Sequence, residues 1–241
     1  NVPVLTSRGG TDILNDDHPL FFGRPGVHRQ RSANFIIQNS DLLISIGSRL
    51  SIPQIGRNYE AFARKAKKII IDIDKDELSK KTIAADIAIN SGAKEFIMEL
   101  LAQLKNNKLN ADFSHWIEKC SSWKSKFSRD YENDKYQKKE VDAYYFIELL
   151  SYELNEDDVI TADSESTLVF VWQTFKFKPK QRLISANGLE NTCFALPASI
   201  GACIGNQMKR VICLCENTDF QKNIQELETI IKYNLPIKIF V

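Results

Sequence analysis

Short apolar runs that alternate with helical patterns constrain the fold of this chain more than any other feature of the sequence. Asp41–Ile46 (DLLISI) and Lys68–Ile73 (KIIIDI) are apolar and lack the two-residue alternation of a half-exposed strand. Strands that are buried on both faces of a parallel sheet have this character. Helical patterns precede and separate these runs, at Arg31–Asn39 and Tyr59–Lys65. We therefore predict an α/β protein in which helices cover both faces of parallel sheets.

The same alternation of strands and helices continues through the second half of the chain. It predicts, in order, a helix near Val141–Leu154, a strand near Val159–Ala162, a helix through Val169–Phe175, a strand at Leu183 and Ile184, a helix that begins near Pro197, a strand at Val211–Cys215, a helix with Ile224, Leu227, Ile230 and Ile231 on one side, and a strand at Pro236–Val241. The chain therefore contains two doubly wound modules with parallel sheets.

A polar stretch separates the two modules. Residues 105–139 are rich in Lys, Asn and Ser, with Trp116, Trp123 and Phe127 spaced through them. We predict a first module in residues 1–107, a helical connector in 108–140 and a second module in 141–241. The chain starts on an apparent strand, Asn1–Leu5 (NVPVL), and stops inside another. We therefore expect a fragment or a shortened relative of a longer protein, with the second module truncated at its C-terminal end.

The charge balance gives no general attraction to nucleic acid or to an acidic membrane. Lys and Arg number 32 against 31 Asp and Glu, so the formal net charge is +1. No apolar run approaches the roughly 20 residues of a membrane span, and the first residues do not resemble a signal peptide. We therefore expect a cytoplasmic protein that binds neither nucleic acid nor membrane.

The five cysteines do not form a disulfide framework, because their number is odd and their spacing irregular. Cys213 and Cys215 lie two residues apart in an apolar run, hence on one face of the predicted strand. This pair could bind a metal, but buried reduced thiols are the preferred interpretation.

Three loops of the second module are candidates for a binding site. In parallel α/β sheets, ligands bind beyond the carboxyl ends of the strands, where a loop leads into a helix. The loops in question follow the strands that end near Ala162, Ile184 and Cys215.

Two of these loops carry a resemblance to a known family. Ser185–Gly201 (SANGLENTCFALPASIG) and Glu216–Val241 (ENTDFQKNIQELETIIKYNLPIKIFV) resemble the cofactor-binding domain of thiamine-diphosphate-dependent enzymes of the acetolactate synthase type. Pro25–Leu50 and Ile69–Leu78 (IIIDIDKDEL) resemble the central domain of that family. The resemblance implies a Rossmann-like central domain followed by a diphosphate-binding domain. It does not include the family's N-terminal pyrimidine-binding domain.

The loop after the third strand departs from the family pattern. In the family this loop reads Gly-Asp-Gly-Ser-Phe, in which the aspartate binds Mg²⁺ and the glycines let backbone amides approach the phosphates. Here Glu216, Asn217, Thr218 and Asp219 occupy the first four positions, and only Phe220 matches. The amide of Asn217 lacks the charge that balances Mg²⁺. The carboxylates of Glu216 and Asp219 would face a diphosphate of the same sign.

The other two loops also differ from the family. Thr192 replaces a methionine that holds the cofactor bent, and Cys193 replaces the following glycine. In the loop after the first strand, Ser164 and Glu165 add bulk and another negative charge in the region where the family usually has a glycine near the phosphates. The positions that the resemblance assigns to the cofactor are Ser164, Glu165, Gly188, Leu189, Thr192, Glu216, Thr218 and Asp219, with Asn217 at the metal position.

The framework residues match the family while the cofactor-facing residues differ. This pattern predicts a non-catalytic relative or fragment that acts as a scaffold or an oligomer subunit, without an assigned catalytic residue. The alternative is part of an active thiamine-diphosphate-dependent decarboxylase or carboligase for 2-oxo acids. In that case a partner or a longer chain supplies the pyrimidine-binding domain, whose glutamate activates the cofactor. Thiamine diphosphate and Mg²⁺ are the cofactors that the resemblance implies, and a homo-oligomer is the expected assembly.

An acidic cluster in the first module, Asp72, Asp74, Asp76 and Glu77, suggests either a metal site or the end of a strand followed by a helix start. We prefer the second interpretation, because acidic residues are favoured by the helix dipole at that position.

A basic group in the first module surrounds His28. Together with Arg24, Arg29 and Arg31, this histidine could hold a phosphate or the diphosphate of a flavin, since some relatives bind FAD in this region. Arg29 replaces a glycine that is often present beside the histidine. FAD is therefore not expected.

Overall fold

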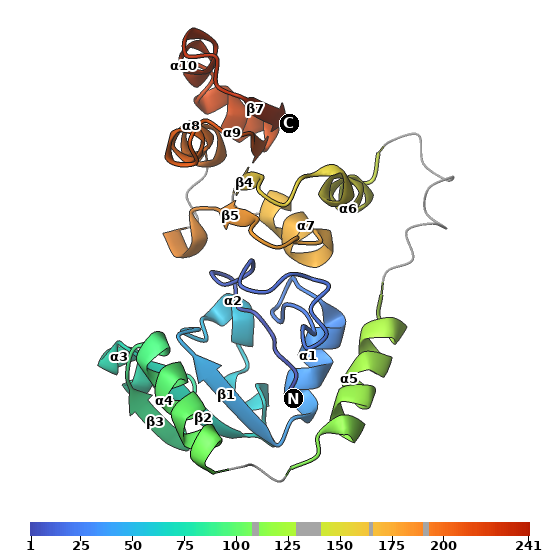
Figure 1. The fold of residues 1–241 in the computed structure, drawn as a ribbon, viewed down its shortest axis with the longest axis vertical. Coiled ribbons are helices and arrows are strands. Elements are labelled where there is room, and N and C mark those ends of the chain that lie inside the picture. Colours follow the sequence, from blue (N-terminus) through green and yellow to red (C-terminus); the bar gives the residue numbers. More distant parts are fainter. Residues whose placement is uncertain (108–110, 129–140, 164–165, 190–192) are drawn as a thin grey trace. The chain divides into compact units, whose positions relative to one another are not determined.

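The computed structural model describes residues 1–107, 111–128, 141–163, 166–189 and 193–241 (Figure 1). The chain divides into two compact units, one formed by residues 1–10 and 22–129 and the other by residues 11–21 and 130–241. Both units have the predicted α/β architecture with parallel strands. No helix within the described ranges is long and apolar enough to cross a membrane.

The first unit contains a three-stranded parallel sheet in the order β1-β2-β3. Its strands are β1 (Leu42–Ile46), β2 (Lys67–Asp72) and β3 (Ile87–Asn90). Its helices are α1 (Arg31–Asn39), α2 (Ile52–Ile55), the 3₁₀ helix η1 (Tyr59–Ala61), α3 (Lys75–Ser79), α4 (Ala93–Asn106) and α5 (Ser114–Lys126).

Helix α5 belongs to the first unit because aromatic residues bind it to α1. Phe35 of α1 stacks on Phe127, with 4.7 Å between the ring centroids, and Phe22 and Ile36 are buried beside Cys120 of α5. The aromatic residues of the predicted connector therefore form a local core. The boundaries at residues 107 and 140 stay a prediction.

The second unit contains a four-stranded parallel sheet in the order β5-β4-β6-β7. Its strands are β4 (Val159–Ala162), β5 (Arg182–Ile184), β6 (Val211–Leu214) and β7 (Ile237–Phe240). Its helices are α6 (Ala143–Glu153), α7 (Ser166–Thr174), the 3₁₀ helix η2 (Asn187–Leu189), α8 (Ala195–Gly205), α9 (Asn217–Lys222) and α10 (Glu226–Lys232).

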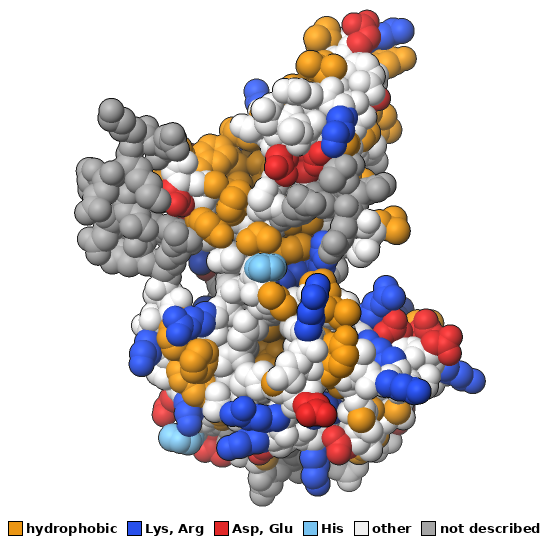
Figure 2. All heavy atoms as spheres, turned by 180° about the vertical axis from the view of Figure 1, so that it is seen from behind, with side chains coloured by type: hydrophobic (Ala, Val, Ile, Leu, Met, Phe, Trp, Pro, Cys, Tyr) orange, Lys and Arg blue, Asp and Glu red, His pale blue; other side chains and the backbone are white. Residues whose placement is uncertain are grey.

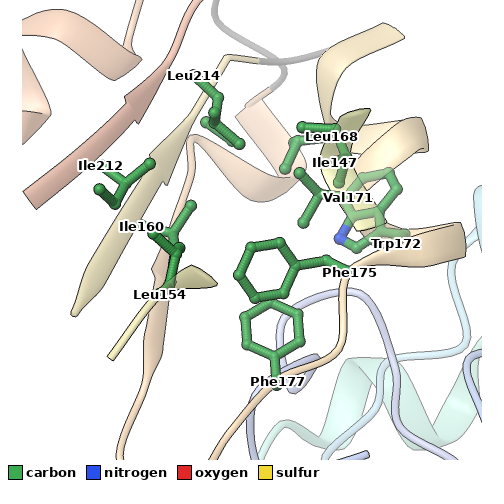
Figure 3. Packing of buried hydrophobic residues seen from close by; sticks show 11 residues of the cluster. Ile147, Leu154, Ile160, Leu168, Val171, Trp172, Phe175, Phe177, Ile212 and Leu214 are labelled. Carbon is green, nitrogen blue, oxygen red and sulfur yellow. The ribbon is translucent and has the colours of Figure 1, made fainter. Parts of the chain in front are cut away.

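The central strands β4 and β6 are buried on both faces, as their continuous apolar runs predict. On one face, Ile160 and Ile212 pack with Phe175 and with residues of α6 and α7 (Figure 3). On the other face, Val211 and Cys213 pack with residues of α8 and α10. This two-sided core fixes the edge at which the loops after β4, β5 and β6 emerge.

Residues 11–21 lie early in the chain but belong to the second unit. The carboxylate of Asp12 accepts hydrogen bonds from the backbone nitrogen of Leu183 at 2.9 Å and from Nε of Arg182 at 2.8 Å. The carboxylate of Asp16 accepts one from the backbone nitrogen of Phe177 at 2.9 Å. These long-range contacts have no signature in the local sequence pattern.

Several predicted elements differ in the structure. Asn1–Leu5 forms no strand beyond an isolated bridge at Val4, and Pro3 lacks the N–H that a ladder needs. Only a 3₁₀ turn occupies the predicted helix at Tyr59–Lys65. The last helix is divided into α9 and α10, and Ile224 lies between them. The short strand β3 escaped prediction because its four residues include only two large apolar side chains.

Candidate functional site

The candidate site lies at the carboxyl edge of the β5-β4-β6-β7 sheet. All four strands are parallel, so the loops after β4, β5 and β6 leave the sheet at the same edge. Ser164, Glu165 and Thr192 lie outside the described residues. The remaining predicted positions belong to η2, to the turn before α8, and to the segment from Glu216 into α9.

The loop after β6 leads directly into α9. Glu216 is the N-cap residue of α9, with an extended backbone and no capping hydrogen bond from its side chain. Its carboxylate instead accepts a 3.4 Å hydrogen bond from the hydroxyl of Ser166. Asn217 and Thr218 are exposed, and Oδ1 of Asn217 accepts a 3.1 Å hydrogen bond from Nε2 of Gln221 on the same helix. The oxygen at the predicted metal position is thus engaged within the protein.

Asp219 turns into the protein and is only 3% exposed. Its Oδ1 lies 3.3 Å from Nζ of Lys222 and accepts a 3.5 Å hydrogen bond from Sγ of Cys193. Nδ2 of Asn223 donates to the backbone oxygen of Cys193 at 2.6 Å. The segment after β6 and the turn before α8 are therefore joined through a buried carboxylate.

A second buried carboxylate, that of Asp163 directly after β4, connects the same loops. Asp163 is 1% exposed and accepts hydrogen bonds from the backbone nitrogens of Ala195 at 2.8 Å and Glu216 at 3.3 Å. Burial raises the pKa of this carboxyl, and the charge of Asp219 raises it further, while the two backbone donors lower it. Sequence reasoning missed this residue, although an acidic side chain directly after a buried strand is a recognisable signal.

The loop after β5 keeps a backbone shape that suits glycine. Gly188 and Leu189 lie in η2 and are exposed, Leu189 to 83%. Cys193 has a φ of 65°, in the left-handed region that glycine adopts freely. A residue with a Cβ atom loses about 1 kcal/mol in that conformation. The backbone at Cys193 thus suits a glycine better than a cysteine.

Two different domains of known proteins match the two halves of the chain. Residues 1–100 match the central domain of thiamine pyrophosphate enzymes, and residues 166–241 match their C-terminal TPP binding domain. The chain belongs to the thiamine pyrophosphate enzyme family.

Curated relatives in this thiamine pyrophosphate enzyme family are similar over the entire chain. It is 32% identical to the probable acetolactate synthase large subunit of Methanococcus aeolicus, covering 100% of the chain and 42% of the relative. It is 32% identical to the acetolactate synthase large subunit of Cyanidium caldarium and 34% identical to that of Porphyra purpurea, covering 100% of the chain and 40% of each relative. The chain thus spans about two fifths of the length of these relatives.

The described residues of this site do not fit the diphosphate and Mg²⁺ that the family implies. The carboxylates of Asp163 and Asp219 are buried where the loops meet, and Oδ1 of Asn217 is bound by Gln221. Within the described ranges, no group of three or more His, Cys, Asp or Glu residues could hold a metal ion. Two buried carboxylates thus lie where the described parts of the loops after β4, β5 and β6 meet.

The acidic cluster of the first unit has the predicted capping role. Asp74 is the N-cap of α3 and accepts a 2.9 Å hydrogen bond from the backbone nitrogen of Asp76. Glu77 forms ion pairs with Arg49 and Lys80, both at 2.8 Å. These contacts explain the acidic residues as a helix start held by neighbouring cations.

The basic group beside His28 includes a strongly perturbed arginine. Arg24 is fully buried. Burial lowers the pKa of Arg29 to about 9, and the charges of Arg8 and Arg24 contribute to this shift. The structure thus gathers positive charge from the start of the chain and from the segment before α1.

Proposed function

We propose that this chain is a non-catalytic member of the thiamine pyrophosphate enzymes that serves as a scaffold or as a subunit of a homo-oligomer. The observation that carries the proposal is the buried carboxylate of Asp219, which lies beside Asp163 and is bound by Lys222 and Cys193. The loop that would receive the diphosphate is instead stabilised by the protein's own acidic side chain.

The electrostatic cost to a bound diphosphate is large. Glu216 and Asp219 are the carboxylates that would face it. At an effective dielectric constant of about 20 and a separation of about 6 Å, one carboxylate raises the free energy of binding by about 3 kcal/mol for each unit charge of the diphosphate. This corresponds to about a hundredfold loss of affinity for each carboxylate. Lys222 offsets only part of it, because its side chain is 58% exposed and screened by water.

Exposed apolar residues support a role in assembly. Helix α4 has 14 residues and none of them is buried. Three of its apolar side chains are widely exposed, namely Ile97 at 42%, Met98 at 62% and Leu101 at 50%. Apolar side chains also reach the surface among charged ones (Figure 2). A contiguous apolar helix face is typical of a surface that contacts a partner. We propose a cytoplasmic location, which the five free thiols support, because disulfides form mainly in oxidising compartments.

The alternative function is part of an active decarboxylase or carboligase for pyruvate or a related 2-oxo acid. The observation in its favour is the similarity, across the whole chain, to acetolactate synthase large subunits. A pyrimidine-binding domain from a longer chain or a partner would have to complete such an enzyme. The form of the protein that carries this domain would then produce acetolactate from pyruvate.

Isothermal titration calorimetry with thiamine diphosphate and Mg²⁺ tests the proposal. We expect no heat of binding at millimolar cofactor. The matched control is the fourfold variant Glu216→Gly, Asn217→Asp, Thr218→Gly, Asp219→Ser, which restores the family loop and should bind. Micromolar binding by the unchanged chain would refute the loss of the site and favour the enzymatic alternative.

A further inference from the structure

Two thiols are in contact beneath the loop after β6. Cys213 lies within β6 and Cys215 directly follows it, so their side chains leave the same face of the strand. Their sulfur atoms are 3.3 Å apart, and both cysteines are free thiols. Cys213 is fully buried and Cys215 is 6% exposed. Water is therefore nearly excluded from the pair.

Polar groups that can stabilise a thiolate surround this dithiol. Thr161 of β4 pairs in register with Cys213 of β6, which places both side chains on one face of the sheet. The hydroxyl of Thr161 lies on a fully buried residue. The hydrogen bond from Cys215 lowers the pKa of Cys213 and burial opposes this effect. The hydroxyls of Thr161 and Ser199 lower this pKa further, while the charge of Asp163 raises it. Cys213 is thus the thiol that ionises first.

We propose that Cys213 and Cys215 form an oxidisable dithiol that a hydroperoxide converts into an intramolecular disulfide. The thiolate of Cys213 attacks one peroxide oxygen, the O–O bond breaks, and the other oxygen leaves as water after taking up a proton. The thiol of Cys215 then attacks the resulting sulfenic sulfur and expels its oxygen as a second water. Two thiols and one hydrogen peroxide thus give one disulfide and two waters. The proposal is independent of cofactor binding.

Disulfide formation should also move the loop after β6. Residues two apart in a strand are separated by about 6.4–6.8 Å between their Cα atoms. This is the far end of the range of about 4.4–6.8 Å that disulfides span, and it exceeds their commonest separation of about 5.5–6 Å. Cys215 lies just beyond the end of β6 and next to Glu216, so the adjustment falls on the turn into α9. The oxidation state of the dithiol is therefore coupled to the shape of the loop that contains Asp219.

The test is peroxide treatment of the folded, reduced full chain, followed by denaturation, alkylation with N-ethylmaleimide and digestion with trypsin. Cleavage after Arg210 and Lys222 leaves both cysteines in one peptide, Val211–Lys222. We expect this peptide to escape alkylation and to be lighter by two hydrogens than its reduced, unalkylated form. Cys203 is the internal reference, because it is equally buried but its sulfur contacts no second thiol in the described part of the chain and donates to the backbone oxygen of Lys209. It should remain alkylatable.

The variant Cys215→Ser separates the dithiol from a merely reactive Cys213. In this variant oxidation should stop at the sulfenic acid of Cys213 without forming a disulfide, and hydrogen exchange of Glu216–Lys222 should not change with peroxide. In the unchanged chain, exchange of that segment should rise on oxidation. The proposal is overturned if the peptide stays doubly alkylated after Cys193 has reacted, or if the oxidised cysteines carry oxygen instead of a disulfide. Equal exchange before and after disulfide formation overturns the coupling to the loop.

Discussion

Neutralising Asp219 should restore much of the affinity for a diphosphate. Asp219→Asn removes the charge and keeps the shape of the side chain, whereas Asp219→Ser also removes bulk and recreates the serine of the family loop. At about 6 Å and an effective dielectric constant of about 20, one unit charge contributes about 3 kcal/mol. We therefore expect each variant to bind thiamine diphosphate with Mg²⁺ up to about a hundredfold more tightly than the unchanged chain.

Calorimetry at matched protein concentration measures this gain, and thermal unfolding shows whether the variants fold. Loss of the partner of Lys222 should cost less than about 1 kcal/mol, because that side chain is 58% exposed. Equal gains in both variants identify charge as the cause, whereas a gain in Asp219→Ser alone identifies bulk. If neither variant binds better while both remain folded, the electrostatic reasoning is wrong.

Three further outcomes are expected. Burial and the charge of Asp219 raise the pKa of Asp163, so this carboxyl binds its proton more tightly in the folded chain than in the unfolded chain. The protonated carboxyl therefore contributes stability that is fully present below its usual pKa of 3.8. This contribution is lost as the pH rises through the raised pKa of the folded chain. The melting temperature of the unchanged chain relative to Asp163→Asn should therefore rise as the pH falls from neutral toward 3.8, and a flat difference would contradict this. Cys193→Gly should increase the free energy of unfolding by up to about 1 kcal/mol in a urea titration, because glycine adopts the left-handed backbone without strain. A decrease in the free energy of unfolding would show that the contact between the thiol and Asp219 contributes more than the strain costs. Met98→Glu on α4 should change stability by less than about 0.5 kcal/mol but reduce the oligomer mass in light scattering, and an unchanged mass would remove α4 from the assembly surface.

Elements with many apolar residues could be predicted from the sequence, while short or mixed elements could not. The runs at β4 and β6 were identifiable because strands buried on both faces are apolar throughout. The apolar runs at β1 and β2 also predicted strands, but β1 is not buried on both faces as expected, because Leu42 and Ile44 are 48% and 45% exposed. Strand β3 is short and pairs in parallel with β2, a contact that its own sequence does not reveal. The segment Tyr59–Lys65 forms only a 3₁₀ helix at Tyr59–Ala61 instead of the predicted α-helix. Local propensity is too weak to decide such segments.

The candidate site could be predicted in its position but not in its contacts. The resemblance located the loops after β5 and β6, and the residue types alone indicated an excess of negative charge. Nothing local indicated that Asp219 would turn inward to Lys222 and Cys193, or that Asp163 would connect two loops. Apart from the pair of Asp219 and Lys222, which are three positions apart, these contacts join residues that are 26 to 53 positions apart.

The sequence by itself determined the α/β class, the family and the altered chemistry of the loop after β6, because periodicity and residue type are local properties. Only the tertiary structure decided which carboxylates are buried, which thiols are in contact, and that residues 11–21 belong to the second unit. Burial and proximity depend on the packing of distant segments, and the same side chain has a different charge and reactivity once water is excluded from it.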